Sequence, residues 1–148
     1  MIAVALVAAG LAMGTSAAPA NRSAAKIERT IKTAVRVAVV DHNYRRACRF
    51  GTQRGRRRLL RGYNSSAGPD YPSCAAIIRH EVEAPGHRGW IAELRDGVVV
   101  DVLWVRGGRA RARVADGPGY YAGQGLVRLC RVDRRWRLDN STLIPYGD

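Results

Sequence analysis

The chain has 148 residues, which is enough for one domain with a single core, and its formal net charge is +13. Such a charge favours anionic partners, such as nucleic acid, acidic cell-wall polymers or lipid head groups. Of the 25 cationic residues only Lys26 and Lys32 are lysine, a bias that a GC-rich genome produces without selection for binding, so both explanations of the charge stay open. The three cysteines and three histidines show no ligand spacing, and we expect neither a metal site nor a cofactor.

The first twenty residues differ in composition from the rest. An apolar run from Ile2 to Met13 leads to Ala18-Pro19-Ala20, an A-x-A cleavage pattern. The run is too short for a permanent membrane span, and it predicts a signal peptide over residues 1–20. No Lys or Arg precedes it, so the apolar N-terminus of a cytosolic protein is the alternative. We expect residues 21–148 to form a secreted, extracytoplasmic domain without a transmembrane segment.

Three helices are expected next. Ser23 is placed to cap the first, which runs to about Val40, and Asp41 to Asn43 offers caps for a short second helix. Ser73 is placed to cap the third, from Cys74 to about Glu83. The first helix has one apolar face, formed by Ile27, Ile31, Ala34, Val35, Ala38 and Val39.

The densest basic run of the chain, Arg54 to Arg61, precedes a predicted loop from Gly62 to Pro72. As a binding patch it would offer an anionic polymer the side chains of Arg56, Arg57, Arg58 and Arg61. The alternative is a solvated helical turn. The second interpretation is favoured because nucleic-acid grooves usually interleave aromatic side chains, and none lies between Phe50 and Tyr63.

The last third predicts four short antiparallel strands. The first hairpin turns at Gly107-Gly108 and the second at Asp133-Arg134. Ala110, Ala112 and Val114 alternate with arginines, which indicates that these apolar side chains lie on the buried face of the sheet. Regular pairing then puts Leu103 opposite Ala112 and Asp101 opposite Val114, also on the buried face. The outer face would carry Trp104, Arg109, Arg111, Arg113 and Cys130.

Helices followed by hairpins predict an α+β fold, with N-terminal helices packed on a curved antiparallel sheet of four or more strands. Several short segments occur in a characteristic order: Tyr44 with Ala47-Cys48, Cys74 opening a helix, Gly108-Arg109-Ala110, and Leu129 with Asp133 before Trp136-Arg137-Leu138-Asp139. Over residues 24–143 this set resembles small exported actinobacterial proteins of the nuclear transport factor 2-like group, which has the cystatin-like cone fold. Arg134 departs from the pattern, which usually has Gly there.

The resemblance implies a cone-shaped domain with a pocket at its open end. The nuclear transport factor 2-like group includes isomerases, dehydratases and epoxide hydrolases as well as proteins that only bind a ligand, so the fold does not decide the function. It also places Cys48 beside Cys74, which favours this disulfide among the three possible pairings and leaves Cys130 free. Closing that loop would stabilise the fold by about 3 kcal/mol.

Three functions follow as hypotheses. The first is a secreted, non-catalytic domain that binds a small ligand or a protein partner in its pocket, with Arg131 and Trp136 as contacts. The second is a pocket enzyme of the isomerase, dehydratase or hydrolase kind, with Asp101 as general base and Tyr44 as hydrogen-bond donor. The alternative, which is favoured, is that Asp101 lies at the rim of the sheet or pairs with an arginine. The third is a basic module that binds an anionic cell-wall polymer or nucleic acid through Arg54–Arg61 and the outer stripe with Arg111 and Arg113.

Overall fold

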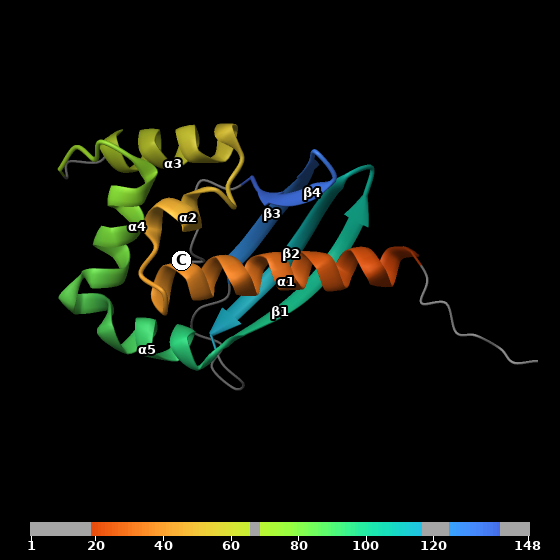
Figure 1. Cartoon of the computed structure of the whole chain (residues 1–148), viewed down its shortest axis with the longest axis horizontal. Coiled ribbons are helices and arrows are strands. Elements are labelled where there is room, and N and C mark those ends of the chain that lie inside the picture. Colours follow the sequence, from red (N-terminus) through yellow and green to blue (C-terminus); the bar gives the residue numbers. More distant parts are fainter. Residues whose placement is uncertain (1–18, 66–68, 117–124, 140–148) are drawn as a thin grey trace, which may run out of the picture.

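A computed structural model describes residues 19–65, 69–116 and 125–139. Five α-helices and one 3₁₀ turn precede four strands in that part of the chain (Figure 1). The helices are α1 (Pro19–Val39), α2 (Tyr44–Cys48), α3 (Gln53–Ser65), α4 (Cys74–Glu83) and α5 (Arg88–Asp96), with the 3₁₀ turn Pro85–His87 before α5. The strands are β1 (Val98–Arg106), β2 (Arg109–Asp116), β3 (Gly125–Val132) and β4 (Arg135–Leu138).

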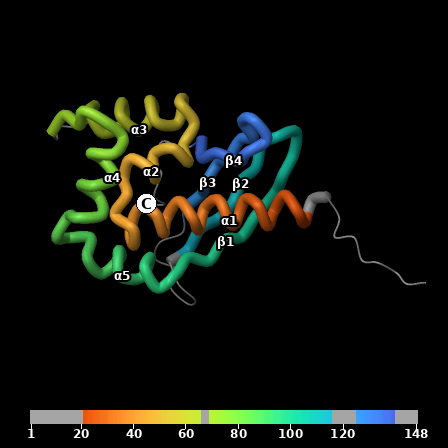
Figure 2. Tube along the Cα trace, in the orientation of Figure 1, coloured from red at the N-terminus to blue at the C-terminus, as the bar shows by residue number. Residues whose placement is uncertain are grey.

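The four strands form one antiparallel sheet in the order β1-β2-β3-β4, so every connection is a hairpin between neighbours. The sheet is curled, and α1 crosses one of its faces, while α2 to α5 gather at one end of the molecule (Figures 1 and 2). The predicted fold class, helices followed by a curved four-stranded antiparallel sheet, is therefore confirmed. The side of the sheet turned away from α1 is called the outer face below.

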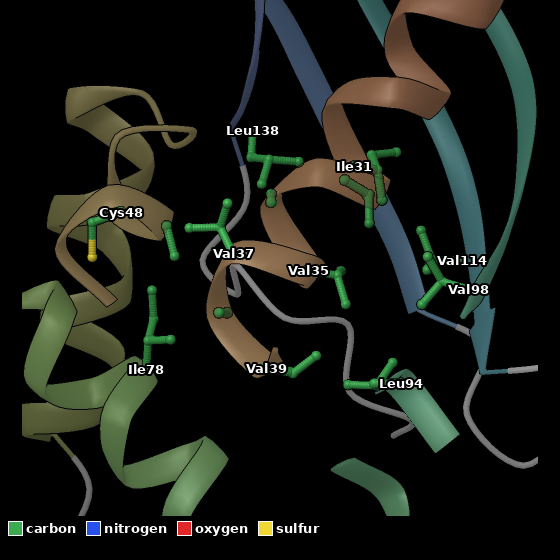
Figure 3. Packing of buried hydrophobic residues seen from close by; sticks show 14 of the residues in the cluster. Ile31, Val35, Val37, Val39, Cys48, Ile78, Leu94, Val98, Val114 and Leu138 are labelled. Atoms are coloured by element: carbon green, nitrogen blue, oxygen red, sulfur yellow. The ribbon is translucent and has the colours of Figure 1, made fainter. Parts of the chain in front are cut away.

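The core forms between α1 and the inner face of the sheet. All six residues of the predicted apolar face of α1 are buried. On the sheet the buried partners include the predicted Ala110, Ala112, Val114, Leu129 and Leu138. In Figure 3, Val35 of α1 points toward Val98 and Val114, whereas Val37 points toward α2 and α4. Because α1 is buried on two sides near its C-terminal end, it joins the sheet to the helical end of the molecule.

A disulfide fastens the helical end. Cys48, the last residue of α2, is bonded to Cys74, the first residue of α4, with a Cα–Cα distance of 6.1 Å. Cys130 is free and half-buried, on the outer face of β3. The predicted pairing is thus confirmed. Two predicted caps also form, since the side chain of Asn43 accepts a hydrogen bond from Arg46 N and that of Ser73 from Ala76 N.

Four local predictions were wrong. The first helix begins at Pro19, so Ser23 lies inside it and does not cap it. Helix α3 continues to Ser65, into the predicted loop. Helix α5, which follows the 3₁₀ turn beginning at Pro85, was not predicted. Only Ile91 and Leu94 of this helix are buried, so its sequence carries a weak helical periodicity.

The fourth concerns strand β1, which contains a bulge. Trp104 pairs with Arg111 as predicted, but Val102 rather than Leu103 pairs with Ala112. Leu103 is the extra residue and is exposed. Every residue of β1 before the bulge therefore lies on the face opposite to the one that regular alternation predicts.

Most of the predicted signal peptide lies outside the described residues, and α1 starts at its last two positions. None of the described helices combines the length and the apolar character needed to cross a membrane.

Candidate anion-binding groove

A groove of about 540 Å³ lies where α1, the end of α2 and the edge strand β4 meet. Its volume falls within the range usual for small-molecule sites. Three segments that are far apart in the sequence build it. Helix α1 contributes Lys26, Arg29 and Thr30; the end of α2 and the residues after it contribute Arg46, Arg49 and Phe50; the last hairpin contributes Arg134, Arg135, Trp136 and Arg137.

The charge of this groove has one sign. Seven of its ten lining residues are cationic, and none of the ten is acidic. Cations that share a concave, partly apolar site reinforce one another's potential and concentrate anions there. Six of the seven are arginines, whose planar guanidinium fits carboxylate and phosphate oxygens in pairs. The groove is therefore suited to an anion with several negative oxygens.

Its floor is aromatic. Trp136 is 6% exposed and belongs to the hydrophobic core, and Phe50 packs against that core. Strand β4 is held beside Phe50 by two main-chain hydrogen bonds, from Leu138 N to Phe50 O and from Thr52 N to Leu138 O, each of 2.8 Å. A bound anion would thus have cations around it and two aromatic rings beneath it.

The two walls are linked across the groove. The Arg137 guanidinium Nη1 donates a hydrogen bond to the main-chain carbonyl of Arg49, at the C-terminal end of α2. Thr52 extends this link to α3, because its hydroxyl donates to Asp139 Oδ1 over 2.7 Å and accepts from Gly55 N over 2.8 Å. The spacing between β4 and α2 is consequently fixed by the fold before any ligand arrives.

The turn at the rim of the groove adopts a conformation unusual for its residues. Asp133 and Arg134 have φ angles of 48° and 62°, both positive, as a two-residue hairpin turn of type I′ requires. Glycine adopts such angles without strain, whereas a residue with a Cβ pays about 1 kcal/mol or more. The turn therefore places an arginine on the groove at a cost in stability.

Tyr44 lies at a different hollow. With His42, Arg45, Ser73 and Arg79 among others, it lines a space of about 520 Å³ between α2 and the start of α4. Its hydroxyl donates to Glu83 Oε1 over 3.0 Å and is 2.8 Å from His42 Nδ1. Burial, followed by the bond to Glu83, raises the pKa of Tyr44 above its ordinary value.

The predicted position of Asp101 was wrong. Because the bulge at Leu103 shifts β1, Asp101 pairs with Arg113 rather than Val114 and is exposed on the outer face of the sheet. It lines neither the groove nor the hollow that Tyr44 lines. The hypothesis of a pocket base has lost its geometric basis.

Only one of the two predicted ligand contacts lines the groove. Arg131 pairs with Trp136 across the hairpin, as predicted, but only Trp136 lines the groove. Arg131 is exposed, and its main-chain N–H donates to Gly108 O over 2.7 Å.

The predicted polymer contacts lie elsewhere. Arg57 and Arg61 are exposed on α3, whereas Arg56 and Arg58 are half-buried there. Arg111 and Arg113 are exposed on the outer face of β2.

A buried acid near α5 is structural. Glu81 of α4 is 6% exposed, and His87 Nδ1 lies 2.9 Å from its main-chain oxygen and 3.3 Å from its Oε2. Burial, and then Glu81, raise the pKa of Tyr63 of α3. These contacts tie α3, α4 and the start of α5 together.

Sequence reasoning identified Trp136 as a ligand contact but named none of the seven cations that line the groove with it. The local signal was Arg134-Arg135-Trp136-Arg137, an aromatic ring among arginines. The contribution of α1 and α2 depends on tertiary packing and had no such signal.

Comparison with models of protein families, with curated proteins and with solved structures finds no match to this chain.

Proposed function

We propose that this chain is an extracytoplasmic binding domain that holds an anionic ligand in the groove between α1, α2 and β4. One observation carries the proposal: among the described residues, seven cations and no acid line a hollow that Trp136 and Phe50 also line. The ligand class that fits has two or more negative oxygens, from phosphate, sulfate or carboxylate groups, beside an apolar or aromatic part.

Binding is favoured over catalysis because of the residue types present. The ten described residues that line the groove include no Asp, Glu, His or Cys, the side chains that most often move protons or attack substrates. The disulfide supports the extracytoplasmic location, since disulfides persist in oxidising compartments. The resemblance to the nuclear transport factor 2-like group agrees with a ligand-binding role and stays part of the proposal.

The test uses 8-anilinonaphthalene-1-sulfonate, an aromatic sulfonate whose fluorescence rises on binding, and inorganic triphosphate as its competitor. Lys26 and Arg29 are exposed, so the double variant Lys26→Gln/Arg29→Gln changes the groove without disturbing the core. We expect it to bind both probes about 10- to 100-fold more weakly, through the loss of two charge-assisted contacts.

The matched control is Arg57→Gln/Arg61→Gln, which removes the same charge from exposed positions of α3. Its affinity should stay within about twofold of the parent chain, because separated surface charges are screened. Equal losses in the two variants would show that net charge, not the groove, attracts the probes.

A further inference from the structure

We infer that the outer face of the sheet is a second anion-binding surface, and that one linear phosphate polymer lies across it and enters the groove. The inference rests on the proposed function of the groove and names the class of its ligand. It concerns a surface of exposed arginines on three strands: Arg109, Arg111 and Arg113 of β2, Arg128 of β3, and Arg106 of β1.

The arginines form a regular array. On β2 they alternate with the buried Ala110, Ala112 and Val114, so all three point to the outer face. Neighbours on one strand are about 7 Å apart and those on adjacent strands about 5 Å apart. Arg111 pairs directly with Arg128. An extended polyanion that follows β2 can therefore meet a guanidinium at each outward position from Arg109 to Arg113, with Arg128 beside Arg111.

The array continues into the groove. Cys130 of β3 pairs with Arg109 of β2 on one side and with Arg137 of β4 on the other. Arg135 of β4 pairs with Val132 of β3. Arg135 and Arg137 also line the groove. The two sites thus share residues at the β4 edge of the sheet, and a ligand longer than the groove has a charged path beyond it.

Acids lie only at the margins of this face among the described strands. Asp101 is on the edge strand β1, and Asp139 follows the edge strand β4, where it accepts the Thr52 hydroxyl bond. A second copy of the chain would meet this face with the same positive charge and be repelled. A protein partner is disfavoured because charged side chains are depleted at the centres of protein interfaces.

The composition of the face selects the polymer. Proteins that bind single-stranded nucleic acid stack bases on several aromatic rings, but Trp104, 40% exposed and paired with Arg111, is the single aromatic residue on the described outer face. Arginine forks match phosphate oxygens without contacting a base. A phosphate polymer without bases is the occupant that this surface fits.

The experiment compares inorganic triphosphate with long-chain polyphosphate. The variant Arg109→Gln/Arg111→Gln/Arg113→Gln should keep the parent affinity for triphosphate within about twofold and bind the long chain at least about tenfold more weakly. The control Arg57→Gln/Arg61→Gln/Arg88→Gln removes the same charge from exposed sites on α3 and α5 and should keep most of the long-chain affinity. Far-ultraviolet circular dichroism and thermal unfolding confirm that both variants fold.

Equal long-chain losses in the two triple variants would overturn the inference, and a larger loss in the helix variant would assign the polymer to α3 instead. Tighter binding of oligothymidylate than of polyphosphate with the same number of phosphates would overturn the choice of a polymer without bases. The two proposals can be refuted separately. If triphosphate does not bind the parent chain but the sheet variant still loses affinity for the long chain, the proposed function of the groove is wrong, while binding of the polymer to the outer face is supported.

Discussion

Arg134 carries two opposing effects at one position. Its φ of 62° is a conformation that glycine adopts freely, while its side chain adds a cation to the rim of the groove. Local strain of this kind persists where something else offsets it, and ligand-binding sites are a common place for it.

Replacing Arg134 with Gly should therefore move stability and binding in opposite directions. We expect the free energy of unfolding to rise by up to about 1 kcal/mol, because the left-handed conformation no longer costs energy. The affinity for triphosphate should fall several-fold with the lost charge. Denaturant unfolding and triphosphate titration measure the two effects. If the variant binds triphosphate as tightly as the parent chain does, Arg134 does not contribute to binding in the groove.

Among the α-helices of the described chain, α2 is the shortest, and it leads directly into the groove: Arg46 lies in the helix, and Arg49 and Phe50 follow it. A helix of five residues does not form alone, and its position depends on what holds it. Its N-terminal end is capped by Asn43, and its C-terminal end is bonded through Cys48 to α4. Arg46 and Arg49, which line the groove, flank that disulfide.

The double variant Cys48→Ser/Cys74→Ser should lose about 3 kcal/mol of stability, because the bond closes a loop with a sequence separation of 26 residues in the unfolded chain. Its affinity for triphosphate should also fall, since the α2 wall is no longer fixed. Cys130→Ser is the control and should change neither quantity, as Cys130 is unpaired and outside the groove. Unchanged groove affinity in the double variant would show that packing alone positions α2.

The elements also show which features a sequence reveals. Local chemistry was sufficient for the caps at Asn43 and Ser73 and for both hairpin turns, since each depends on residues a few positions apart. The faces of β2, β3 and β4 followed from alternation. The bulge at Leu103 has no such signal, because Val102, Leu103 and Val105 are all apolar and suit either face. One undetected residue was enough to misplace Asp101.

For the whole molecule, the question is whether the net charge of +13 is spread over the surface or gathered into binding sites. The structure collects cations in a groove made by three distant segments and in an array on the outer sheet face. Such clusters arise only on folding, which is why composition by itself favoured the compositional explanation of the charge. Fold class followed from the order of the elements, whereas the site required their packing.

Salt dependence distinguishes the two explanations. If the sites are organised, the logarithm of affinity for long-chain polyphosphate should fall steeply with the logarithm of salt concentration. The slope for the singly charged aromatic sulfonate should be several-fold shallower, because it displaces fewer counterions. The outer-face triple variant should flatten the polyphosphate slope more than the helix triple variant. Identical slopes in the two variants would indicate attraction by net charge alone.

The bulge also bears on how this chain is to be compared with others. Because Leu103 opposes no residue of β2, a chain that lacks this one position keeps every pairing between the two strands, and Trp104, Val102 and Asp101 keep their faces. A related chain can thus be one residue shorter here and have the same sheet, whereas the loss of Ala112 from the central strand β2 would shift its pairing with both neighbours. An alignment that allows no gap at Leu103 would therefore match surface residues of β1 to core residues of the related chain.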